Sequence, residues 1–189
     1  MSQGFNTRER ILDAAEELFY NEGLLTVNVD RIAAKASVTK KTLYYYFRSK
    51  DDLMAECLVR IDAPTRTRYE RLMDGAPGDF SARMHGVLAD IARRGANIRW
   101  KGCGFSRAAA ELAGMPGHPA RKAASSHKRH VEMWLQKELE AEGYADARDK
   151  SKQLMILIDG LIAQLLLHND QQYGHAAQRM VDEILRIPA

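Results

Sequence analysis

The sequence predicts an all-helical (all-α) protein of about nine helices. Apolar residues recur at intervals of three and four along almost the whole chain, as on one face of an α-helix, and no segment alternates with the period of two that is typical of a strand. Capping residues and glycines stand where these periodic segments end. A chain of 189 residues is also long enough to bury a core without metal or disulfide support.

The first predicted helix runs from about Asn6 to Glu22. Asn6 with Glu9 makes a variant of the capping box, and Gly23 supplies a left-handed stop. One stripe of apolar side chains is expected to face a core: Ile11, Ala14, Ala15, Leu18 and Phe19.

Two short helices and a longer one follow. Asn28 is expected to cap the second helix, the chain turns at Ser37, and Thr39 is expected to cap the third. Ser49 then caps a fourth helix from residue 50 toward residue 74, with a kink or break at Pro64. Three N-terminal helices with a tight turn between the second and third describe a helix-turn-helix over residues 28–47.

Five more helices are predicted after a turn at residues 75–79. They span roughly residues 80–98, 105–113, 119–142, 147–169 and 175–187. The most apolar stretch, residues 154–167, is 14 residues long, whereas a membrane span needs about 20. It predicts a buried helix and no membrane partner.

Charge is distributed unevenly along a chain whose net charge is only +3. Residues 31–50 contain no acid, while acids crowd both flanks. Such a basic patch either attracts a phosphate backbone or is a solvated helix face. Its members are Arg31, Lys35, Lys40, Lys41, Arg48 and Lys50.

The third helix has a polar side suited to the DNA major groove, where lysine donates to guanine and threonine serves several bases. The candidates on this side are Thr39, Lys40, Lys41, Thr42, Tyr44 and Tyr45. Asn28, Arg48 and Lys50 are better placed for phosphates. Val38, Leu43, Tyr46 and Phe47 are expected to pack inward; core packing is the alternative for Tyr44 and Tyr45 as well.

The run RILDAAEELFYNEGLLTVNVDRIAAKASVTKKTLYYYFRSKDDL, residues 10–53, resembles the DNA-binding domain of the TetR family of bacterial regulators. The resemblance implies phosphate contacts for Tyr44 and Lys50, and base readout by Thr39, Lys40, Lys41 and Tyr45. It also implies a DNA-binding domain over residues 1–48 and a regulatory and dimerisation domain over residues 49–189. The family usually has glycine in the turn, where this chain has Ser37, and serine at positive φ is strained by about 1 kcal/mol.

The C-terminal part predicts a homodimer. The helix at residues 147–169 is apolar around more than one face, so it needs covering on two sides. A four-helix bundle built from two chains would supply this cover; the alternative is a monomer with this helix at its centre. The expected interface is Leu154, Ile158, Leu161, Ile162, Leu165, Ala177, Met180, Val181 and Ile184.

The family plan also implies a small-molecule ligand, and six apolar residues could line its pocket or simply be core: Met84, Leu88, Phe105, Leu112, Trp134 and Leu161. Cys103 is expected to be a buried residue at a helix start, with thiol sensing as the alternative. His127 and His130 have a spacing that can hold a metal, but nothing else supports one, so we expect solvated side chains.

The predicted function is a cytoplasmic transcription regulator, a repressor that a small molecule releases from a palindromic operator in double-stranded DNA. The alternative is a DNA-binding regulator or activator without an inducer. No catalytic motif is present, so we expect neither an enzyme nor a cofactor. Cys57 and Cys103 have no spacing typical of a disulfide framework or a metal site, and the first residues lack a signal peptide.

Overall fold

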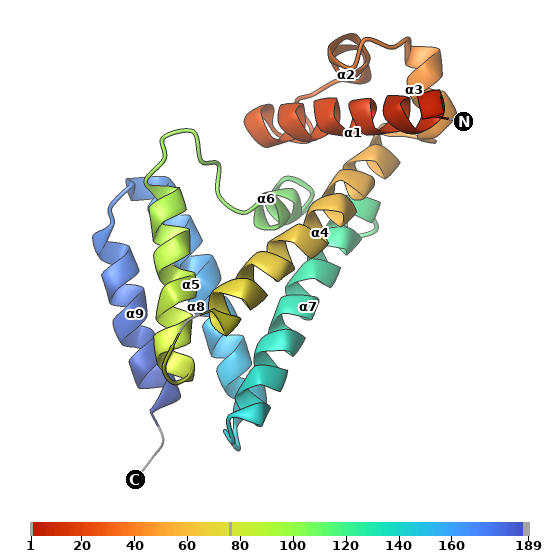
Figure 1. Cartoon of the computed structure of the whole chain (residues 1–189). Helices are drawn as coiled ribbons and strands as arrows, with labels where there is room; N and C mark the ends of the chain where they lie inside the picture. Colours follow the sequence, from red (N-terminus) through yellow and green to blue (C-terminus); the bar gives the residue numbers. More distant parts are fainter. Residues whose placement is uncertain (1, 76, 187–189) are drawn as a thin grey trace. The chain divides into compact units, whose positions relative to one another are not determined.

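Every regular element in the described part of the chain is a helix, which confirms the all-helical fold class. The computed structural model describes residues 2–75 and 77–186, with side chains from residue 7 onward. Within these residues there are nine helices (Figure 1): α1 (Ser2–Glu22), α2 (Val29–Lys35), α3 (Lys40–Tyr46), α4 (Lys50–Asp74), α5 (Phe80–Gly95), α6 (Gly104–Glu111), α7 (Pro119–Ala141), α8 (Ala147–His168) and α9 (Gln172–Leu185).

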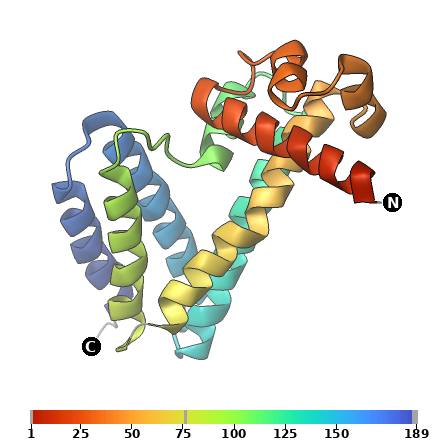
Figure 2. The same cartoon turned by 45° about the horizontal axis from the view of Figure 1, so that its top comes forward.

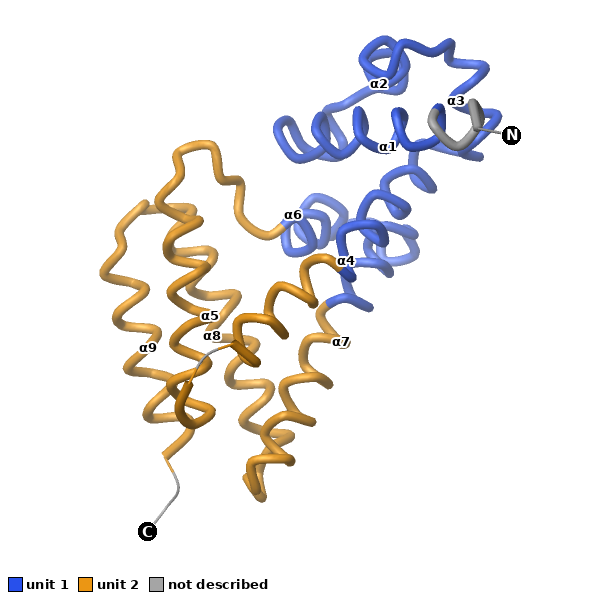
Figure 3. The backbone as a smooth tube through the Cα atoms, viewed as in Figure 1, with its two compact units in different colours: residues 1–63, 104–127 blue, residues 64–103, 128–189 orange. Residues whose placement is uncertain are grey.

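The helices pack into two compact units, which Figure 3 colours separately. Unit 1 comprises residues 1–63 and 104–127, so it contains α1 to α3, the first part of α4, α6 and the start of α7. Unit 2 comprises residues 64–103 and 128–189, with α5, α8, α9 and the remainders of α4 and α7. The division at residue 48 follows the sequence motif instead of these contacts, and it stays a prediction.

Unit 1 buries the apolar stripe that the sequence predicts on α1. Ile11 and Ala15 have no exposed surface. Leu43 of α3 and Leu53 of α4 are likewise fully buried, and Phe47, just after α3, is 2% exposed. The apolar faces of the N-terminal helices and of the first turn of α4 therefore all point inward.

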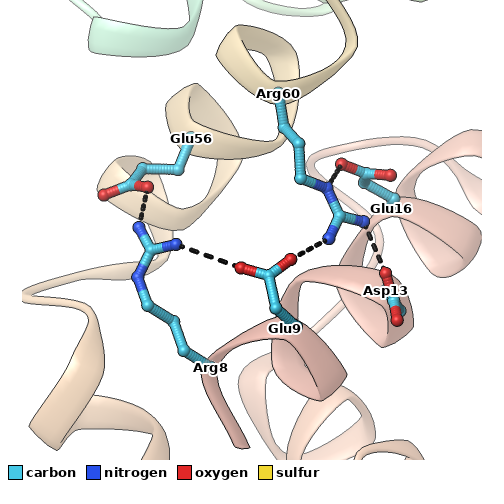
Figure 4. A network of polar contacts seen from close by, with 6 residues as sticks. All are labelled: Arg8, Glu9, Asp13, Glu16, Glu56 and Arg60. Carbon is cyan, nitrogen blue, oxygen red and sulfur yellow. Dashed lines mark hydrogen bonds and ion pairs between the residues drawn. The ribbon is translucent and has the colours of Figure 1, made fainter. Parts of the chain in front are cut away.

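An ion-pair network around Arg60 joins α4 to α1 within unit 1 (Figure 4). The Arg60 guanidinium donates hydrogen bonds to three carboxylates on α1: those of Glu16 at 2.5 Å, Asp13 at 2.7 Å and Glu9 at 2.9 Å. The hydrogen bond to Glu16, followed by those to the other carboxylates, raises the pKa of Arg60. Arg8 and Glu56 form a further pair between the same two helices.

In unit 2, helices α5, α8 and α9 lie side by side, as both Figure 1 and Figure 2 show. Leu88 of α5, Leu154 of α8 and Val181 of α9 have no exposed surface. Gly174 lets α9 approach α5 closely, because a Cβ at this position would lie 2.9 Å from the Cβ of Ala92.

Three helix ends differ by three residues or more from the sequence prediction, and one predicted break is absent. Helix α1 begins at Ser2, so the predicted cap Asn6 lies within the helix, and its side chain falls outside the described residues. Helix α5 ends at Gly95 instead of residue 98. Helix α9 begins at Gln172, because the carboxylate of Asp170 accepts a hydrogen bond from the N–H of Gln172 at 2.9 Å and so starts the helix three residues early.

The fourth helix is not broken at its proline. Helix α4 continues through Pro64, which lacks the N–H that a helix interior uses. Helical residues continue from Lys50 to Asp74 on both sides of this position. The boundary between the two units nevertheless falls between residues 63 and 64.

Candidate nucleic-acid interface

Side-chain caps begin both short helices of the helix-turn-helix, as the sequence predicts. The side-chain oxygen of Asn28 accepts a hydrogen bond from the N–H of Arg31 at 2.9 Å and fixes the start of α2. Thr39 accepts from the N–H of Thr42 at 3.0 Å and fixes the start of α3. These caps matter because helices of 7 residues are too short to be stable by propensity alone.

The turn between α2 and α3 passes through Ser37 in the left-handed conformation, with φ at 52°. The backbone therefore does adopt the strained geometry expected of a residue that replaces glycine here. Arg10 of α1 donates hydrogen bonds to the carbonyl of Ser37 at 3.0 Å and to that of Ala36. Sequence reasoning missed this role of Arg10, because nothing in its spacing shows that a polar residue of α1 faces the turn.

Helix α3 has one buried face and one exposed face. Leu43 is fully buried and Phe47 is 2% exposed, whereas Tyr44 is 44% and Tyr45 is 81% exposed. The core-packing alternative for Tyr44 and Tyr45 is therefore wrong. Tyr46, expected in the core, is only half-buried, and its ring packs edge-on against that of the exposed Tyr45 with centroids 5.0 Å apart.

The polar residues at the start of α3 differ in whether their side chains interact with other side chains of the unit. The hydroxyls of Thr39 and Thr42 lie 2.8 Å apart and bond to each other. The Lys40 ammonium is paired with the carboxylate of Asp30 at 3.1 Å. Lys41 is exposed. A base contact by Lys40 would need its ion pair to open, whereas Lys41 points to solvent.

Half of the basic patch is neutralised by neighbouring acids. Arg31 pairs with Glu22 and, through a second hydrogen bond at 2.8 Å, lowers the pKa of that carboxyl. Lys35 pairs with Glu17 at 2.9 Å, and Lys40 pairs with Asp30 as described above. The three other basic residues of the patch lie on α3, directly after it and at the start of α4: Lys41, Arg48 and Lys50.

The predicted phosphate-contacting residues flank α3. Asn28 and Arg48 are exposed, the former with its side-chain oxygen engaged in the cap of α2. Lys50 is half-buried, and its ammonium donates to the carbonyl of Leu25 at 3.3 Å. Burial lowers the pKa of Lys50. The hydrogen bond to Leu25 fixes the direction of the Lys50 side chain, whereas Arg48 is exposed to solvent.

Most residues of the predicted dimer interface lie in the core of unit 2. The side chains below 10% exposed in a single chain are Leu154, Ile158, Leu161, Ile162, Leu165, Ala177 and Val181. Ile184 is half-buried, and Met180 is 52% exposed. A side chain that is already buried in its own chain offers little surface to a partner.

The outward face of α8 is also apolar. Ile156 and Leu167 are each 73% exposed, and the exposed residues Gly160 and Ala163 lie between them at helical spacing. A groove of about 510 Å³ runs between this face and α9, where Met180 lines it. The sequence could not separate this stripe from the buried one, because both are apolar.

The six residues of the predicted ligand pocket are distributed over both units. Phe105 and Leu112 belong to unit 1, and the others belong to unit 2. All are buried except Trp134, which is partly buried against the core of unit 2. Leu161 also lines the groove between α8 and α9. A pocket formed by these residues stays a prediction.

The expectation that His127 is solvated is wrong. Its ring is 3% exposed, stacks on Phe105 with centroids 3.6 Å apart, and places Nδ1 2.6 Å from a carboxylate oxygen of Asp62. His130 is exposed, and Cys103 is half-buried directly before α6. No group of three or more His, Cys, Asp or Glu residues in the described ranges is arranged to hold a metal ion.

Comparison with known proteins identifies the N-terminal part of the chain. The family model "Bacterial regulatory proteins, tetR family" matches residues 11–57. TetC of transposon Tn10 from Escherichia coli is 34% identical over 69 residues, and the regulator AcrR of Shigella flexneri is 40% identical over 50. The chain covers only 35% of TetC and 23% of AcrR, so these matches concern only part of each relative.

The similarity to solved structures extends over the whole chain. A TetR-family regulator from Streptomyces coelicolor is 29% identical, with 96% of this chain and 95% of that chain covered and a TM-score of 0.84. The reduced form of NemR from Escherichia coli shares the fold, at 22% identity, 97% and 98% coverage and a TM-score of 0.85.

An all-helical chain with an N-terminal helix-turn-helix defines the class: DNA-binding transcriptional regulators. Residues 11–57 match the DNA-binding domain of the TetR family, and the chain has the fold of a TetR-family regulator over almost its whole length. As for a membrane, none of the described helices has both the length and the apolarity to cross one.

Proposed function

We propose that this protein binds a specific operator in double-stranded DNA by placing α3 in the major groove. The observation that supports this most directly is the division of α3 into a buried face, with Leu43 at 0% exposure, and a solvent face on which Tyr45 is 81% exposed. The Tyr45 side chain combines a large ring with a phenolic O–H, and it therefore suits the apolar and hydrogen-bonding edges of a base pair.

The candidate DNA-contacting side chains divide into two roles. Lys41 and Tyr45, together with Thr39, Lys40 and Thr42, read base edges in the groove. Tyr44, Arg48, Lys50 and Asn28 contact the phosphates on either side and fix the orientation of α3. The ion pair between Lys40 and Asp30 gives way to DNA, so Lys40 contributes less net energy than Lys41.

A second copy of the chain covers the apolar outer face of α8 and α9. Gly160 supports this step. A Cβ at Gly160 would meet no atom of its own chain within 4 Å, so the described fold does not need glycine there, although glycine weakens a helix by about 1 kcal/mol relative to alanine. Close approach of a partner helix explains the residue. A two-fold dimer would present two α3 helices to half-sites about 34 Å apart.

The dimer is tested by adding bulk at this glycine. Gly160→Trp should leave helix content unchanged and shift the mass measured by sedimentation from dimer to monomer. Gly114→Trp is the matched control, because a Cβ there also meets nothing within 4 Å. A dimer that survives Gly160→Trp at micromolar concentration would exclude this face as the interface.

A small-molecule ligand completes the proposed function: it lowers operator affinity, and the protein acts as a repressor. The match of residues 11–57 to the TetR family and the helical unit 2 support this step. A ligand lowers operator affinity only if it binds the DNA-binding conformation more weakly than the conformation that does not bind DNA. The coupling free energy between ligand and DNA is typically about 1–3 kcal/mol. A compound screen on the operator complex tests it. If no compound releases the operator, the protein is a regulator without an inducer.

DNA recognition itself is tested by selecting duplexes from a random pool. The proposal predicts enrichment of a palindrome with half-sites one helical turn apart. Tyr45→Ala should abolish the enrichment, while Ile98→Ala, which also removes a highly exposed apolar side chain, should not. A pool that remains random after repeated rounds at moderate salt would refute sequence-specific binding.

A further inference from the structure

Unit 1 contains a cavity of about 190 Å³ among α1, α4 and α6, and this cavity is partly open to solvent. Phe19 and Leu24 come from α1 and the segment after it, Met54 and Leu58 from α4, and Ala108 from α6. All five are buried side chains. An apolar lining that is partly open to solvent leaves apolar surface in contact with water, and an occupant would remove that surface from water.

Small residues keep the space open. Ala108 is 1% exposed, and its side chain ends at Cβ. A Cβ added at Gly104 would meet the Cδ1 of Ile61 at 3.7 Å, an ordinary contact, so the backbone of the described chain does not require glycine here. Cys57 is a third small lining residue, and burial raises the pKa of its thiol, so it remains uncharged.

The charged groups around the cavity are already engaged with one another or with the backbone. The Glu111 carboxylate accepts hydrogen bonds from the N–H groups of Leu24 at 2.7 Å and Leu25 at 3.2 Å. Arg107 donates to the carbonyl of Tyr20 at 2.7 Å. Glu16 accepts from Arg60 as described above. The charged lining residues are two carboxylates and one guanidinium, so an anion meets net negative charge, and the rest of the lining is mostly apolar, which favours an uncharged occupant.

We propose that this cavity binds a small, uncharged aromatic molecule of one or two rings. Its size supports this class, because a dry apolar cavity of about 150 Å³ is known to accommodate benzene. The site is formed by residues of unit 1 alone and is separate from the ligand pocket that the sequence predicts around Met84 and Leu88. Bound there, the molecule would contact both α6 and the C-terminal end of α1.

Indole is a suitable probe, with binding measured by NMR titration of the full-length protein. We expect saturable binding and intermolecular contacts between indole protons and the Met54 methyl group. Ala108→Met fills the cavity and should weaken binding at least tenfold. Ala110→Met, which adds the same bulk at an exposed position of α6, should leave it unchanged.

Indole-3-acetate tests the charge argument and should bind at least tenfold more weakly than indole. Absence of saturable binding up to the solubility limit of indole would overturn the proposal, as would equal affinity for Ala108→Met and the wild type. Should Ala108→Met fail to fold, the Met54 contact in the wild type decides: its absence from a saturated sample overturns the proposal. None of these outcomes depends on DNA binding.

Discussion

Replacing Ser37 by glycine should stabilise the protein. The left-handed backbone at φ 52° costs a residue with a Cβ about 1–2 kcal/mol, whereas glycine adopts it freely. Glycine in turn loses about 0.4–1 kcal/mol more chain entropy on folding. The Ser37 side chain is exposed, and the hydrogen bonds at this residue, from its N–H to Ala34 and from Arg10 to its carbonyl, involve only its backbone. The expected net gain is about 0.5–1 kcal/mol.

The assay is urea unfolding followed by circular dichroism at one fixed protein concentration. For a chain of this length the gain corresponds to a rise in Tm of about 1–4 °C. Ser37→Ala keeps the Cβ and should be nearly neutral, so it separates backbone strain from loss of the hydroxyl. A Ser37→Gly variant that is less stable than the wild type, or no more stable than Ser37→Ala, would refute the reasoning.

Three further outcomes follow from the site and from unit 1. Lys41→Ala should relax sequence preference by about 1–3 kcal/mol at one base pair, whereas Lys50→Ala should weaken all sites alike and reduce the salt slope by about one; equal effects on preference would contradict the assigned roles. Arg60→Gln should destabilise the protein by about 1 kcal/mol at low salt and less at 1 M salt, as measured by urea unfolding, because its partners are partly exposed; a salt-independent loss would point to packing instead. Cys57 should resist thiol reagents at pH 8 until the protein unfolds, since burial raises its pKa; rapid alkylation in the native state of a Cys103→Ser variant would show the opposite.

Local signals explain why the helix-turn-helix could be predicted in such detail. The caps at Asn28, Thr39 and Ser49 each bond to an N–H three residues onward, a relation written in the sequence itself. The exposure of Tyr44 and Tyr45 follows from helical spacing once Leu43 and Phe47 are assigned to the core.

Relations between distant segments escaped prediction. Glu111 caps N–H groups 86 and 87 residues away, and the cavity beside it depends on which small residues meet in space. His127 looked like a surface residue because its neighbours on α7 are polar, yet its ring is covered by Phe105 and paired with Asp62. Helix α8 escaped prediction for another reason. It has apolar residues on two faces, and the sequence alone does not show which of the two is buried within the chain.

The orientation of α3 can be measured by photo-cross-linking. A protein with p-benzoylphenylalanine in place of Tyr45, which is 81% exposed, should cross-link to its selected operator duplex. The same group in place of Val59, 64% exposed on α4 of the same unit, is the control and should cross-link weakly or not at all. Strong cross-linking from position 59 with none from position 45 would show that α3 does not face the DNA.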